Sequence, residues 1–208
     1  MGLLKRRAAD PVPVAAPRSV ASLIYTLRGA ATAAERRAAA LDLMAAPEAA
    51  AELIAALAEE PHVQVQQAIV TALISIGTSP ASAGLARLLA SGDTALRNAA
   101  IEALQQMGAP AAVQMEALLA APDPDLRLFA LNVLSALRYP PALAWLRVAV
   151  NRDENVNVGL AAVEALAEQG DPADAPAFRA FAARFPGEAF VAFAVTLACR
   201  RVLSDCGT

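Results

Sequence analysis

A segment of about thirteen residues recurs along this chain, and the recurrence constrains the fold more than any other feature. Each full copy places Ala three residues after its first residue, Ala-Leu after seven and eight, and Gly after twelve. Full copies begin at Val65, Leu96 and Val158, an altered copy at Leu126, and weaker copies near Glu35 and Phe190. We name these first residues the anchors. They are 30 to 32 residues apart, so the sequence predicts about six structural repeats.

Each copy has the pattern of one amphipathic helix. Apolar residues at the anchor and at 3, 4, 7 and 8 residues beyond it follow the helical period, and the closing glycine suits a helix C-cap. A capping residue or proline precedes each copy, at Thr32, Pro61, Asp93, Pro122 to Asp125, and Asp153. Further upstream lie Ala/Leu-rich runs that open with proline: Pro47–Glu59, Pro80–Ala90, Pro110–Ala120 and Pro140–Val150.

One repeat is therefore a helix, a turn and a second helix, and such a pair cannot bury its apolar stripe without neighbours. The sequence shows no alternating β-branched runs that would indicate strands. We predict an all-α fold, a right-handed superhelical α-solenoid of about six helix-turn-helix repeats. Residues 19–208 form a single repeat domain in this interpretation, after a flexible N-terminal leader over residues 1–18 that contains Pro11, Pro13 and Pro17.

The hydrophobic fraction of 57% does not indicate a membrane protein, because much of it is alanine and no charge-free stretch reaches the roughly 20 residues of a spanning helix. Lys5, Arg6 and Arg7 are not followed by the apolar region of a secretory signal. Cys199 and Cys206 are too few for a disulfide framework, so we interpret them as free thiols. These features predict a cytoplasmic protein without a membrane partner.

The repeat resembles the HEAT-repeat family, especially the short bacterial repeats of phycobilisome-lyase-like proteins, over about residues 19 to 204. In that family an Asp in the turn and an Arg just inside the second helix form a ladder between neighbours. The matching positions here are Asp93 with Arg97, and Asp123 or Asp125 with Arg127. The place of the arginine is taken by Gln66 in one repeat and by Gly159 in another, so the resemblance implies an incomplete ladder.

The chain lacks the groups that most enzymes need. His62 is the only histidine and lies in a predicted turn, where a solvated side chain is the expected state. Carboxylate pairs such as Glu59 and Glu60 fall at predicted helix ends, where capping explains them. No Gly-rich phosphate loop is present. We therefore predict no catalytic residues, no metal and no cofactor.

The second helices of a HEAT-like stack line its concave side, and their outward positions carry a polar, mildly acidic stripe. The predicted partner-binding residues on it are Gln67, Thr71, Asn98, Glu102, Gln105, Asn132, Ser135 and Glu164. Amide and carboxylate side chains of this kind can form hydrogen bonds with a peptide. We predict a non-catalytic scaffold or adaptor that binds another protein or peptide on this face.

Three alternatives remain open. The apolar, aromatic C-terminal segment from Phe190 to Val202 could dock onto a second copy or a partner, giving a homodimer in the first case. Relatives of the short-repeat kind attach or detach bilin chromophores, so the resemblance also implies a bilin lyase-like protein or a chromophore-protein accessory factor. A helical-repeat nucleic-acid binder would need a basic concave surface, which the net charge of −3 and the acidic stripe disfavour.

Overall fold

The computed structural model describes residues 18–137, 139–169 and 171–204. The predicted leader, apart from its last residue, and Cys206 lie outside these ranges. Within the described residues the chain forms twelve α-helices and two short 3-10 helices, and no strand. The α-helices are α1 (Val20–Gly29), α2 (Ala33–Asp42), α3 (Ala50–Glu59), α4 (Val63–Ile76), α5 (Ser79–Leu88), α6 (Thr94–Leu104), α7 (Ala109–Leu118), α8 (Pro124–Ala136), α9 (Ala142–Arg152), α10 (Val156–Gln169), α11 (Ala175–Arg184) and α12 (Ala189–Ser204). The 3-10 helices η1 (Pro47–Ala49) and η2 (Pro172–Asp174) lead into α3 and α11.

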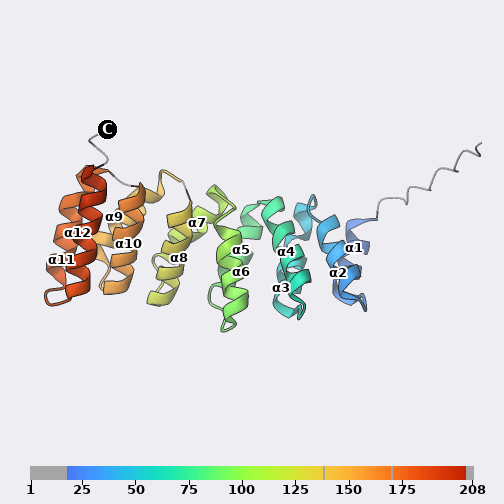
Figure 1. Ribbon diagram of the computed structural model, residues 1–208. Coiled ribbons are helices and arrows are strands. Elements are labelled where there is room, and N and C mark those ends of the chain that lie inside the picture. Colours follow the sequence, from blue (N-terminus) through green and yellow to red (C-terminus); the bar gives the residue numbers. More distant parts are fainter. Residues whose placement is uncertain (1–17, 138, 170, 205–208) are drawn as a thin grey trace, which may run out of the picture.

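The helices form six pairs stacked in a row, with α1 and α2 at one end and α11 and α12 at the other (Figure 1). Each helix contacts its partner within the pair, and it also contacts the corresponding helices of the neighbouring pairs. Odd-numbered helices thus form one layer and even-numbered helices the other. This arrangement confirms the predicted all-α solenoid of six repeats, in which every repeat buries its apolar stripe against the next one.

Alanine at the contact positions lets neighbouring helices approach closely. Ala72, Ala103 and Ala165, each seven residues after an anchor, are almost completely buried, as are the leucines that follow them. Interhelical distance depends on the side chains at the contact, so small residues there allow tight stacking. The alanines at these repeated positions therefore belong to the core.

Most of the predicted helix starts are correct, and one is wrong. Thr32 and Asp93 cap α2 and α6 by accepting hydrogen bonds from backbone amides, as the sequence predicts. Asp123 caps α8 in the same way. Asp153, however, ends α9 and does not cap α10. Asn155 takes that place, because its Oδ1 accepts hydrogen bonds from the backbone amides of Asn157 and Val158.

The predicted glycine C-caps are correct at Gly77 and wrong at Gly108. Gly77 follows α4 with φ of 60°, the left-handed conformation that terminates many helices. The other helix, α6, already ends at Leu104 and continues as a turn. Gly108 has φ of 65° and ψ of −136° and lies at the start of α7. A positive φ is needed at both glycines, but at Gly108 it turns the chain into the next helix.

Candidate partner-binding face

Each of the helices α2, α4, α6 and α8 has near its start a polar side chain that forms a hydrogen bond with the turn before the helix. Arg36, Gln66, Arg97 and Arg127 each donate a hydrogen bond to the backbone carbonyl six residues earlier, over 2.7 to 2.9 Å. These carbonyls lie at or just beyond the end of the preceding helix, where backbone acceptors lack helical partners. The glutamine therefore performs the same local task as the arginines, although it carries no charge.

Arginines and carboxylates connect neighbouring repeats, but the carboxylates are not those of the predicted ladder. Arg36 contacts both carboxylate oxygens of Glu60 at 2.7 and 3.0 Å, and Arg127 contacts both oxygens of Asp153 at 2.8 and 3.0 Å. Both carboxylate side chains are nearly buried, with 5% and 9% exposed. A third bidentate pair joins Arg147 of α9 to Asp174 of η2.

The aspartates of the predicted ladder have local contacts, whereas Arg97 contacts the next repeat. Asp93 accepts from the amides of Ala95 and Leu96 within its own helix start. Asp125 is exposed, and its backbone amide donates to the side chain of Asp123. Arg97 places its guanidinium 5.2 Å from the ring centre of Phe129 in the next repeat. At this junction a cation–π contact takes the place of the ion pair that Arg36 and Arg127 form at theirs.

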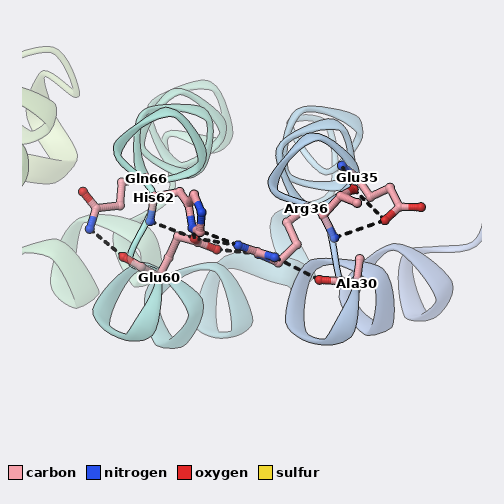
Figure 2. A network of polar contacts seen from close by, with 7 residues as sticks. Ala30, Glu35, Arg36, Glu60, His62 and Gln66 are labelled. Carbon is pink, nitrogen blue, oxygen red and sulfur yellow. Dashed lines mark hydrogen bonds and ion pairs between the residues drawn. The ribbon is translucent and has the colours of Figure 1, made fainter.

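Glu60 is the centre of the polar network shown in Figure 2. Besides Arg36, the backbone amide of His62 donates to it at 2.9 Å, and the His62 Nδ1 lies 3.1 Å from the same carboxylate oxygen. The hydrogen bonds from Arg36 are the main cause that lowers the pKa of Glu60 to about 2, against the opposing effect of burial. Glu60 is therefore ionised at neutral pH and holds the first two repeats together.

The fifth repeat replaces the missing arginine with side chains from α11. A Cβ atom on Gly159 would lie 2.2 Å from Cε2 of Phe181, so the Phe181 ring occupies the space that a side chain would need. Arg184 then supplies the guanidinium, which donates to the carbonyls of Val150, Asn151 and Asp153 at the end of α9. The gap in the predicted ladder is thus filled from the following repeat.

The predicted partner-binding residues all lie on the side of the even-numbered helices that faces away from the odd layer, which we name the even-helix face. Gln67, Thr71, Asn98, Glu102, Asn132 and Glu164 are exposed there, and Gln105 and Ser135 are half-buried. The Gln105 amide donates to Oδ1 of Asn132 at 2.8 Å, which links α6 to α8. The structure therefore places all eight residues on one continuous layer surface.

The register of the sixth repeat differs by one residue from the sequence prediction. Phe190 is 47% exposed, whereas Val191 is fully buried and begins the apolar stripe of α12. With Val191 as the anchor, Phe193 and Leu197 occupy the outward positions that Asn98 and Glu102 occupy in the third repeat. These two side chains are 67% and 48% exposed. They lie on the even-helix face, whereas a register that begins at Phe190 places them in the buried stripe.

Two adjoining hollows cross the C-terminal half of this face. The first, about 380 Å³, lies between α8 and α10 and is lined by residues that include Phe129, Asn132 and Ser135. The second, about 580 Å³, lies between α10 and α12 beside Phe193 and Leu197. Glu164 and Glu168 of α10 line both hollows. We name the two together the C-terminal groove.

The ranges that the structure describes hold neither a metal-ligating cluster nor a membrane-spanning helix. None of the groups of His, Cys, Asp and Glu side chains there could hold a metal ion. In the same ranges, no helix is long and apolar enough to cross a membrane.

Comparison with known proteins places the chain in a family. No curated protein matches it. A crystal structure of an engineered protein is similar, with 17% sequence identity and a TM-score of 0.42, over 89% of this chain and 96% of the other. The sequence model for HEAT repeats matches residues 50–115 and 111–191, which together exceed half of the chain. The six stacked helix pairs and this match show that the chain belongs to the HEAT-repeat family.

Proposed function

We propose that this protein is a non-catalytic scaffold or adaptor that binds another protein along its even-helix face. The observation that carries the proposal is the continuity of this face. Exposed amide and carboxylate side chains lie on α4, α6, α8 and α10 in succession, and Asn132 and Glu164 line the hollows that extend to α12. HEAT-repeat proteins generally act as protein-interaction scaffolds, and an extended layer surface of this kind suits a long, polar partner contact.

The polar groups of the face favour a protein or peptide partner. Glu102 and Glu164 are exposed acids, and Gln67, Asn98 and Asn132 present amides that both donate and accept hydrogen bonds. Nucleic acid would instead need clustered cations along this layer. The arginines at the starts of α2 and α8, Arg36 and Arg127, are committed to the ion pairs with Glu60 and Asp153 and are largely buried.

Affinity capture from a lysate of the source organism tests the proposal. The wild-type chain is compared with a variant that carries Glu102→Lys, Asn132→Lys and Glu164→Lys on the even-helix face. The matched control carries Glu59→Lys, Glu116→Lys and Ala117→Lys, which alter exposed residues of α3 and α7 in the odd layer and change the net charge equally. Retained proteins are identified by mass spectrometry.

We expect at least one protein that the wild type and the control retain and the even-face variant loses. Equal retention by all three chains would show that the binding surface lies elsewhere. Loss with the control alone would place the contact on the odd layer. Either result would overturn the proposed use of the even-helix face.

A further inference from the structure

The C-terminal groove combines an apolar wall with an unbalanced negative charge. Phe190, Phe193 and Leu197 project from α12 at helical spacing, and each is about half exposed or more. A solvated helix face of the terminal repeat would normally be polar. Large apolar side chains gathered along a hollow mark an interaction surface more often than isolated ones do. The groove therefore has the form of a docking site for an apolar stripe.

The charge in the groove lies on α10, across from that wall. Glu164 and Glu168 are one helical turn apart, and like charges at this spacing repel each other and destabilise a helix. Arg201 contacts Glu168 at 3.2 Å and offsets part of this repulsion. Glu164 has no ion-pair partner within the described part of the chain, and it lies where the two hollows meet. A cation of a bound partner could pair with Glu164 at this point.

We infer that the C-terminal groove binds a basic amphipathic helix of a partner protein. The apolar side of such a helix would cover Phe193 and Leu197, and a Lys or Arg at its margin would reach Glu164. The exposed apolar side chains of α12 at helical spacing, with an acidic side chain across the hollow, fit the helix-in-groove mode of recognition and favour a basic partner. The inference rests on the proposed function, since it names the partner chemistry for one end of the even-helix face.

Fluorescence anisotropy with synthetic probes tests this directly. The probe is a labelled 18-residue peptide in which Leu and Lys follow the helical period. A second probe replaces every Lys with Glu, and a third scrambles the order so that the residues no longer share faces. The proteins are the wild type, Glu164→Lys, Phe193→Ser, and Glu116→Lys as a control on the odd layer. All three altered side chains are exposed, and circular dichroism checks that each variant folds.

We expect the wild type to bind the Lys probe at least roughly tenfold more tightly than the Glu and scrambled probes. Glu164→Lys and Phe193→Ser should each weaken that binding about tenfold, and added salt should weaken it further. Glu116→Lys should bind like the wild type. Equal binding of the Lys probe by the wild type and both groove variants would overturn the inference, and so would equal binding of the Glu or scrambled probe.

A second copy of the chain is the competing occupant, and light scattering without the probe detects it. A wild-type dimer that Phe193→Ser converts to a monomer would overturn the inference in favour of self-association.

The lysate capture separates this inference from the proposed function. If Glu164→Lys with Phe193→Ser retains every partner while Glu102→Lys with Asn132→Lys loses one, the scaffold proposal stands and the groove inference fails. If all even-face variants retain every partner, the proposed function itself fails.

Discussion

The network around Glu60 predicts a defined loss of stability in acid. Its side chain is 5% exposed and accepts hydrogen bonds from Arg36 and from the His62 amide. These contacts lower the pKa from the ordinary 4.5 to about 2. A difference of this size between folded and unfolded chains corresponds to about 3 kcal/mol of stability at neutral pH, as an order of magnitude.

The direction in which stability changes with pH follows from proton binding. Between pH 4.5 and about pH 2 the unfolded chain binds more protons at Glu60 than the folded chain does, so the free energy of unfolding falls as the pH falls. The contribution is complete above pH 4.5 and is lost as the pH approaches 2. At pH 3 about 2 of the 3 kcal/mol should already be gone.

Glu60→Gln removes this dependence because the amide does not titrate. Urea denaturation at pH 7 and pH 3 measures the free energy of unfolding of the variant, the wild type and Glu59→Gln, a control at the exposed neighbouring carboxylate. The wild type and the control should lose about 2 kcal/mol more than Glu60→Gln over this range. An equal loss in all three chains would refute the assignment of the network as a source of acid sensitivity.

Three further predictions concern stability, and urea denaturation measures each. Gly159→Ala should cost about 1–3 kcal/mol, because its Cβ collides with the Phe181 ring, and adding Phe181→Leu should recover part of that cost. Arg127→Met leaves the Asp153 carboxylate buried and unpaired and should cost about 3 kcal/mol, whereas Arg28→Met breaks an exposed pair and should cost less than about 1 kcal/mol. Asp93→Ala removes the N-cap of α6 and should cost about 1 kcal/mol.

The repeat pattern predicts the architecture well because it reports the buried stripe directly. An anchor followed by apolar residues at 3, 4, 7 and 8 places describes one helix face, and stacking buries most of that face in the second to fifth repeats. The even-helix face then follows from the same register, since its positions are those that the stripe excludes. The eight predicted polar residues consequently lie together, from Gln67 in α4 to Glu164 in α10.

The ion pairs between repeats depend on loop length, which the repeat pattern does not contain. Glu60 follows Arg36 by 24 residues and Asp153 follows Arg127 by 26. Capping aspartates such as Asp93 have the residue type that the family ladder uses, yet they bond within their own helix. Only the folded turns show which carboxylate faces the arginine of the preceding repeat.

The last two repeats show a second limit of sequence reasoning. Gly159 carries no side chain, so nothing at that position indicates that Phe181 and Arg184 of α11 complete the repeat. The stripe of α12 begins at Val191, one residue later than the periodicity suggests. A shift of one residue rotates a helix by 100°, which moves Phe193 and Leu197 from the expected buried stripe to the exposed even-helix face.

Site-specific photo-crosslinking in the source organism tests whether a partner protein binds the even-helix face. A photoreactive amino acid replaces Asn132 on the even-helix face in one chain and Glu116 on the odd layer in another, both at exposed positions. We expect the probe at position 132 to form a discrete crosslink to a protein partner and the probe at position 116 to form none. A discrete crosslink from position 116 with none from position 132 would contradict it.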